Sequence, residues 1–244
     1  IVLQDTTTAS VGGSLTANAI TVKAESNELL ELSATAFQAA GTAAVGASVG
    51  TIVFKGKTFA IVRPGTTLTA ANGNIIVYAD SKEKVSMTVL GGGAGGTAAV
   101  NGSFAVLVMN VTTQAKVEDG TSGNGSSLSA LKGSVTVKAT DTTDLNLNTG
   151  NVVGGGAAAV GAAIEVAVYR NTVTAMIGNY NTVTAKSILV QAIADRDIQA
   201  AAVMASASGT ASINGSILVL SIGAGTTDPD ANKAETNGGG NSSD

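Results

Sequence analysis

Four copies of one sequence element recur along this chain of 244 residues. Each copy reads Leu-x-Ala or Val-x-Ala and continues into a β-branched run that ends in alanine. The closing alanines lie 55, 60 and 53 residues apart, at Ala24, Ala79, Ala139 and Ala192. A unit this short cannot bury an apolar face alone, so its copies must stack on one another. The repeat therefore predicts an elongated array rather than a globule.

The same offsets align four strand-like segments in each copy. Alternating apolar and polar residues, β-branched enrichment and Gly/Asn/Ser turns favour strands over helices. We expect Val22, Val77, Val137 and Val190 on the first strand to lie one above another. The second strand is predicted to turn Leu30, Val85, Leu145 and Ile198 inward, and the fourth to turn Ala60 and Val62, Ala115 and Val117, and Ala175 and Ile177 inward.

The third strand has the longest alternation, and its bulkier column is predicted to face inward. That column reads Val45, Ala47, Val49, Thr51 and Val53; Val100, Gly102, Phe104, Val106 and Val108; Val160, Ala162, Ile164, Val166 and Val168; and Ile213, Gly215, Ile217, Val219 and Ser221. The other column is small, with apolar Ile52, Leu107, Ala167 and Leu220. Because strands apolar on both faces are usually covered on both, this sheet is expected to lie between two layers or to face a partner chain.

We predict an all-β fold: a right-handed parallel β-helix (β-solenoid) of about four repeats of roughly 55 residues. Two coils of roughly 27 residues per repeat are favoured, because one coil of small side chains would enclose too wide an interior at about 3.3 Å per residue. A rival geometry makes residues 54–58 and 169–172 hairpin turns and places antiparallel pairs inside each repeat.

Residues 1–223 are assigned to one solenoid domain, with repeats at about 14–67, 68–127, 128–182 and 183–223. Residues 224–244 are expected to form a polar, partly disordered loop or tail that opens a further repeat element. Lys233 to Glu235 would be the fourth strand of the fourth copy, displaced by a longer loop.

Composition narrows the function. The chain has no Cys, His or Trp, only 3% aromatic residues and a net charge of −4. The absence of a basic patch argues against nucleic acid as a partner. The sequence contains no run of 18 apolar residues, so membrane insertion of this segment is not predicted. A core of Ala, Val and Gly must be thin, with its layers close together.

Acidic residues gather at one place in every repeat, between the first and second strands, where we expect a turn. They are Glu25, Glu28, Asp80, Glu83, Asp141, Asp144, Asp195 and Asp197. Stacked carboxylates suggest a ladder that binds Ca²⁺ or a cationic ligand. The preferred interpretation is a solvated turn, partly neutralised by Lys82, Lys84 and Arg196. We therefore predict no metal site and no cofactor.

Catalytic chemistry has few candidates. Without His or Cys, the usual nucleophile–base pairs and zinc sites are unavailable. Paired carboxylates could cleave polysaccharide, but the strands show no outward acid pair and Glu165 stands alone. The Gly-rich segments 91–96 and 154–156 lack the Gly-Lys-Ser/Thr of a phosphate loop, so they are interpreted as bends where backbone packs closely. No catalytic residue is predicted.

The pattern Leu-x-Ala, Val-x-Val-x-Ala, a charged stretch, then Gly-x-Ala-Ala-Val-Gly-Ala resembles the repeats of large Gram-negative surface adhesins. These are the filamentous-haemagglutinin-like and leukotoxin-type filamentous adhesin families. Residues 156–165 and 42–50 carry the resemblance best, and it covers about residues 14–223. It implies export across the outer membrane and extracellular display at the bacterial cell surface, with a role in adhesion and virulence.

Three hypotheses follow. The first is a non-enzymatic structural shaft or adhesive segment that contacts a host or bacterial surface protein or glycan. The second is a β-helix that binds or cleaves polysaccharide. The third is a matrix protein that associates with itself through its small-residue face.

Overall fold

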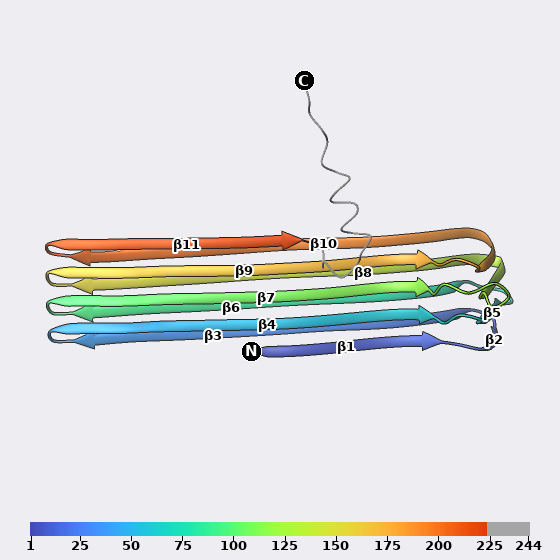
Figure 1. The fold of residues 1–244 in the computed structure, drawn as a ribbon, viewed down its shortest axis with the longest axis horizontal. Helices are drawn as coiled ribbons and strands as arrows, with labels where there is room; N and C mark the ends of the chain where they lie inside the picture. The colour runs from blue at the N-terminus through green and yellow to red at the C-terminus, as the bar shows by residue number, and fades with distance from the viewer. Residues whose placement is uncertain (224–244) are drawn as a thin grey trace, which may run out of the picture.

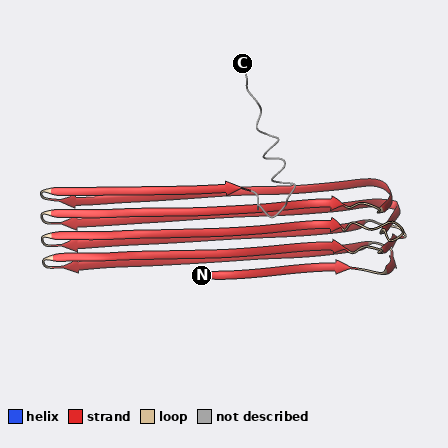
Figure 2. Cartoon of the chain, in the orientation of Figure 1, coloured by secondary structure: helices blue, strands red, loops and turns tan. Residues whose placement is uncertain are grey.

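Parallel strands form most of the described chain. The computed structural model describes residues 1–223, and this part contains no helix (Figures 1 and 2). The strands are β1 (Val2–Val11), β2 (Ser14–Ala17), β3 (Ile20–Ala40), β4 (Ala43–Val62), β5 (Thr67–Ala70), β6 (Ile75–Gly95), β7 (Ala98–Val117), β8 (Ser127–Gly155), β9 (Ala158–Ile177), β10 (Thr182–Ser208) and β11 (Ala211–Gly223). The prediction for residues 224–244 lies outside this range.

The strands build two parallel sheets that face each other. The first sheet has the order β1-β4-β7-β9-β11, and the second joins β2, β3, β5, β6, β8 and β10. In each coil the chain runs the length of the second sheet, reverses in a two-residue turn such as Gly41-Thr42, and returns along the first. The coils stack into a slab whose tight turns share one end, while the short strands and longer loops lie at the other (Figure 1). The predicted stacked parallel architecture is confirmed.

The strand registers reproduce the offsets of the sequence repeat. Ile20 pairs with Ile75, which in turn pairs with Val135, and Ile188 pairs with Val135 from the next coil. The predicted column of valines is also observed: Val22 pairs with Val77, and Val77 with Val137, which also pairs with Val190. Backbone hydrogen bonds along the stack thus connect equivalent residues of successive copies.

Two coils per repeat is wrong, because residues paired between neighbouring coils are a full repeat apart. One coil takes 55 residues between β3 and β6, and β4 pairs with β7 at the same spacing. The hairpin alternative is also wrong, since β4 and β9 continue through the supposed turns. The slab avoids a wide interior by pressing two long strands flat against each other, so small side chains suffice to fill it.

The third predicted strand is turned the opposite way from the prediction. Its small column faces the interior, where Ser48 and Ile52 are buried, while Val45 and Val49 are 75% and 63% exposed. The reason is parity. Because β4 is one uninterrupted strand, the residues that share a face with buried Ala60 and Val62 have even numbers throughout. The prediction placed odd residues inward before residue 54 and even ones after it, which requires a break that does not exist.

Close approach of the sheets explains the small interior column. A Cβ atom at Gly50 would lie 2.5 Å from Val89 Cγ2 and 2.9 Å from Leu32 Cδ2, and a Cβ at Gly91 would lie 2.5 Å from Ser103 Oγ. Near the tight turns the layers are therefore too close for larger side chains. Within the Gly-rich segments, a Cβ atom at Gly96 would collide with the backbone carbonyl of Gly41, and one at Gly155 with that of Ala158. Close backbone packing is therefore found there, but residues 91–95 continue strand β6 and do not form a bend.

The interior is divided into apolar clusters. The largest lies near the looped end and includes Val62, Leu68, Val77 and Val137. A second contains Leu30, Val85, Leu145 and Phe54, and a small third cluster near the tight turns contains Ala44, Ala99, Val153 and Ala159. Polar side chains lie between these clusters, and they include three of the acidic residues singled out above, Glu28, Glu83 and Asp141.

Candidate functional site

The predicted charged turn does not exist. The first and second predicted strands form one continuous strand in β3, β6, β8 and β10. The acidic residues therefore stand in mid-strand, where successive side chains point to opposite faces of the sheet. Glu28, Glu83 and Asp141 share the interior face with buried neighbours, whereas Glu25, Asp80, Asp144, Asp195 and Asp197 are on the outer face.

Glu83 and Asp141 form the centre of a buried polar cluster. Their residues are only 2% and 0% exposed. Thr143 Oγ1 lies between them, 3.3 Å from Glu83 Oε2 and 3.1 Å from Asp141 Oδ1. Ser81 donates to Glu83 from the same strand, and Thr113 donates to Asp141 Oδ2 across the interior at 3.0 Å.

The opposite sheet completes this cluster with Tyr169 and Asn171 of β9. The Tyr169 hydroxyl is 2.6 Å from Thr143 Oγ1 and accepts a hydrogen bond from Asn171 Nδ2 at 2.7 Å. Asn171 Nδ2 also donates to Asp141. The Arg196 guanidinium lies 5.7 Å from the Tyr169 ring centre. The cluster thus joins both sheets through hydrogen bonds in an otherwise apolar core.

Burial controls protonation in this cluster. Burial, reinforced by the neighbouring Asp141 charge, raises the pKa of Glu83 to about 8. Burial also raises the pKa of Asp141, opposed by hydrogen bonds from Thr113, Asn171 and Thr143. Burial raises the pKa of Tyr169 to about 12. At neutral pH the cluster therefore holds a protonated Glu83, which can donate a hydrogen bond as well as accept one.

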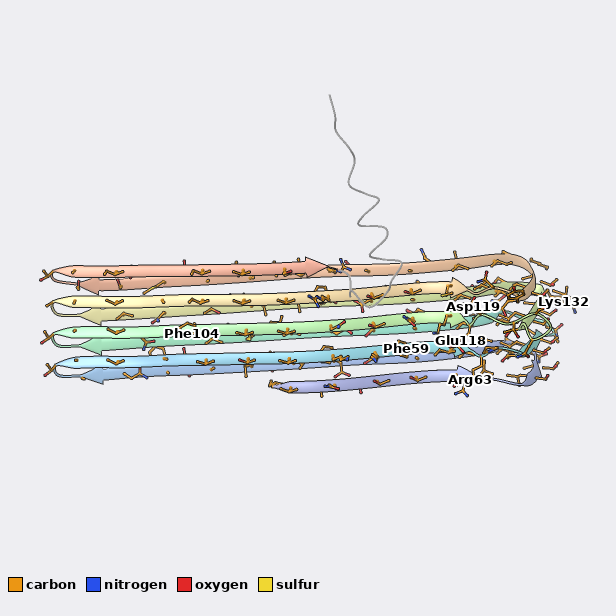
Figure 3. The ribbon with its side chains drawn as sticks, viewed as in Figure 1. Phe59, Arg63, Phe104, Glu118, Asp119 and Lys132 are labelled. Carbon is orange, nitrogen blue, oxygen red and sulfur yellow. The ribbon has the colours of Figure 1, made fainter. Side chains whose placement is uncertain are left out.

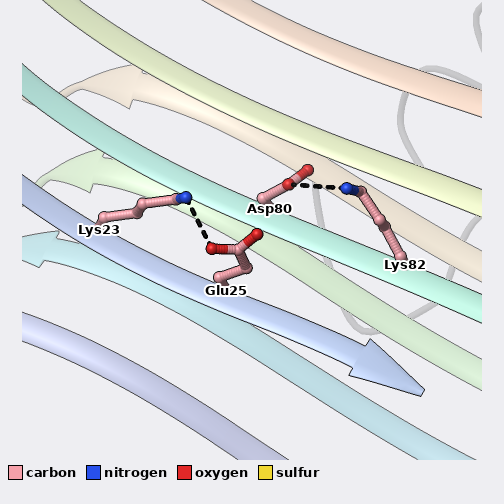
Figure 4. Close-up of polar contacts among 4 residues, drawn as sticks. All are labelled: Lys23, Glu25, Asp80 and Lys82. Carbon is pink, nitrogen blue, oxygen red and sulfur yellow. Dashed lines mark ion pairs between the residues drawn. The ribbon is translucent and has the colours of Figure 1, made fainter.

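Three of the outward acids, Glu25, Asp80 and Asp144, form ion pairs with lysines. Lys23 Nζ lies 2.6 Å from Glu25 Oε2, and Lys82 Nζ lies 3.7 Å from Asp80 Oδ2 (Figure 4). The contact between Lys23 and Glu25 lowers the pKa of Glu25 and raises that of Lys23. Between these coils the Tyr78 ring is flanked by Lys23 and Lys138, with their Nζ atoms 5.7 and 5.8 Å from its centre. Glu25 and the lysines of these pairs are exposed to solvent, whereas Asp80 is buried on the outer side of the sheet.

The eight acids therefore do not form one ladder. Some face the interior and the others lie on the outer face, so acids that are close in the sequence are on opposite sides of the sheet. Among residues 1–223, no group of three or more acidic side chains is placed to hold a metal ion. The outward acids other than Asp80 are exposed or half-buried, as a solvated position requires, and the inward ones have an internal structural role that the sequence reasoning missed.

A second buried polar group lies nearer the tight turns, around Glu165 of β9. Glu165 was expected to stand alone on the outside, yet it is fully buried because β9 has the same inverted facing as β4. Thr149 donates to its Oε2 at 3.0 Å, and burial raises its pKa. Asn101 and Asn151 are buried near the same level and donate to the carbonyls of Gly92 and Ala162, respectively.

The outer surface differs between the two ends of the slab. We call residues 33–54, 88–109, 148–169 and 201–222 the turn half, and the remaining described residues the loop half. The only charged residue in the turn half is Glu165, which is buried. Figure 3 shows Phe104 in the turn half and the labelled Arg63, Glu118, Asp119 and Lys132 at the other end.

The first sheet gives the turn half a continuous apolar exterior, which we call the valine face. It is formed by the outward residues of β4, β7, β9 and β11 and is the bulky column that was predicted to lie inside. Its exposed members include Val45, Val49, Val100, Phe104, Val108, Val160, Ile213, Ile217 and Val219. The signal that could have found it is strand parity, counted back from Ala60 and Val62.

The second sheet is less apolar at the same level. Phe37, Leu90, Val152 and Val203 line a shallow hollow of about 270 Å³ on its exterior. Phe37 lies over Gly92 and Leu90 over Gly150, where a Cβ atom would collide with these side chains. Thr35, Thr88 and Asn148 stand among them on the outward face. This exterior is uncharged but mixed in polarity.

Comparison with known proteins finds no matching family model, no matching curated protein and no matching solved structure. Among residues 1–223 there is also no helix with the length and hydropathy to cross a membrane.

Proposed function

We propose that this chain is a right-handed parallel β-helix of four repeats that serves as a structural shaft or adhesive segment of a secreted, surface-displayed bacterial protein. Its role is to hold binding surfaces at a distance, or to present its own faces to a host or bacterial surface protein or glycan. It performs no catalysis in this proposal.

The observation that carries the proposal is the uninterrupted coil-to-coil register. Strands of about 20 residues pair along their whole length with the equivalent strand of the next coil. Each coil contacts its neighbours only, so such a stack lengthens by adding coils without changing its cross-section. Backbone hydrogen bonds between coils run along the stacking axis. They make the stack resist bending away from that axis, as a spacer must. The resemblance to filamentous adhesin repeats points to the same role.

Surface labelling tests the location. Antibodies raised against the 244-residue chain should label intact cells that produce the protein, and protease treatment of intact cells should remove the label. Labelling that requires permeabilised cells would contradict surface display. Binding of the purified chain to host cells then distinguishes an adhesive segment, which should bind, from a passive spacer, which should not. The loop-half variant Lys138→Glu serves as the comparison.

A polysaccharide-binding or polysaccharide-cleaving β-helix is the alternative. It receives less support, because Glu83, Asp141 and Glu165 are buried, and Glu25 and Asp80 are paired with lysines. A polysaccharide-cleavage screen and a glycan array distinguish the two. Release of reducing ends that is lost in Glu25→Gln or Asp80→Asn would favour the alternative, whereas the shaft proposal expects no cleavage.

A further inference from the structure

We propose that the valine face is an interface between two copies of this chain, which pack sheet against sheet. The valine face comprises the outward side chains of residues 43–53, 98–108, 158–168 and 211–221. This inference goes beyond the shaft proposal and does not depend on where the protein is displayed.

The first argument is the cost of leaving this face in water. Val45, Val49, Ile213 and Ile217 are 75%, 63%, 64% and 54% exposed, and no charged side chain interrupts the face. Exposed apolar patches of more than a few hundred Å² mark interaction sites on soluble proteins. In the loop half, by contrast, the same strands direct Lys55, Lys57, Lys116 and Arg170 outward.

The second argument is size. Four strands about 4.8 Å apart, each contributing about 11 residues at roughly 3.3 Å, give a face of about 700 Å². A stable specific interface buries about 800 Å² on each partner. One valine face packed against another therefore reaches the usual range without help from other surfaces.

The third argument is shape and chemistry. Phe104 is the only aromatic residue on the valine face, and its ring lies over Gly102, where a Cβ atom would come within 2.9 Å of Phe104 Cε2. The ring therefore rests on the sheet and leaves the face flat. A flat, uncharged sheet of β-branched residues fits another such sheet at about 10 Å separation. Within the described residues, the surface that best meets this description is the valine face of a second copy.

A two-fold arrangement follows, because the same patch must serve on both copies. The centre of the face lies between β7 and β9, at Phe104 and Ile164, which pair in register. A lipid surface is a weaker occupant, since the net charge of −4 disfavours anionic membranes.

The test uses the whole 244-residue chain in sedimentation velocity over a hundredfold range of concentration. We expect a dimer that dissociates on dilution. The double variant Val49→Lys/Phe104→Lys should weaken it by at least a hundredfold, while Thr112→Lys, on the outer face of β7 in the loop half, should leave it unchanged. Both substitutions are on the outside, so the circular dichroism spectrum should be that of the parent chain.

Cross-linking locates the interface. Because the chain has no cysteine, Ile164→Cys introduces a single thiol near the expected two-fold axis. Under mild oxidation it should form a disulfide-linked dimer much faster than Thr112→Cys does. A strictly monomeric parent chain would overturn the proposal, and so would a dimer that survives the double lysine variant. Binding of monomer to neutral phosphatidylcholine vesicles, lost in that variant, would overturn it in favour of a lipid partner.

Discussion

The two halves of the slab distribute the same kinds of residue in opposite ways. In the loop half, aliphatic side chains such as Val77 and Val137 are fully buried and the exterior carries the charges. In the turn half, Gly, Ala, Ser and Asn supply much of the interior, while a continuous row of Val and Ile side chains stands outside. The backbone arrangement is the same in both halves. The difference shows that sheet separation, rather than hydrophobicity alone, decides which column lies inside.

The same charge placed in each half tests whether these positions are buried or exposed. Val77→Asp buries an unpaired carboxylate in the largest cluster and should cost at least about 4 kcal/mol or prevent folding. Val100→Asp places the carboxylate on the outside of the turn half, where it should cost no more than about 1 kcal/mol. Denaturant unfolding followed by circular dichroism, at concentrations low enough for the chain to be monomeric, measures both. Equal losses at the two positions would mean that Val100 is buried too.

Much of the fold could be predicted from the sequence, because the repeat offsets of 55 and 60 residues recur in the strand registers. Stacked copies must pair at their own spacing, so Val22, Val77 and Val137 could be placed in one column. The number of coils per repeat could not, because it depends on how close the sheets come. The predicted facing of β4 was wrong for a related reason. A hydrophobicity pattern does not show that Gly50 has no room for a Cβ atom.

The acidic residues show a further limit. Their recurrence at one level of the repeat was visible, but their chemistry depends on which side of the strand each occupies. Glu83 and Asp80 are three residues apart and point to opposite faces. Glu83 belongs to the polar cluster of the interior and has a raised pKa, whereas Asp80 lies on the outer face of the strand and pairs with Lys82. The predicted turn could not distinguish Asp80 from Glu83, because the strand continues through both residues and only the face that each occupies differs.

The buried acids make stability depend on pH. Glu83 has a folded pKa of about 8 against an ordinary 4.5, so the unfolded chain loses this proton first as pH rises. The stability that Glu83 contributes is fully present below pH 4.5 and is lost as pH rises toward 8, which amounts to about 5 kcal/mol in all. Urea unfolding between pH 4.5 and 8.5 should show this decline. Glu83→Gln should flatten it, whereas an unchanged slope would contradict the assignment.

Overpacking tests the turn half from inside. Gly50→Val places a branched side chain against Val89 and Leu32 and should cost about 2 kcal/mol, because the sheets must separate locally. Its neighbour Val49 points outward, so Val49→Ala should change stability by less than about 0.5 kcal/mol. Thermal unfolding of the two variants, compared at equal protein concentration and in dilute solution, measures the difference. Greater damage from Val49→Ala would reverse the facing assigned to β4.

The smallest effect is expected from the ion pairs of the loop half. Lys84 Nζ and Asp144 Oδ2 are 3.7 Å apart, with side chains 66% and 45% exposed. Solvent screens such a pair, so a double-mutant cycle with Lys84→Gln and Asp144→Asn should give a coupling of no more than about 0.5 kcal/mol. A coupling above about 1 kcal/mol would mean that surface charge stabilises the stack. If the coupling is as small as expected, the charges of the loop half act mainly to keep that half soluble, and their absence from the turn half leaves its valine face free to pack.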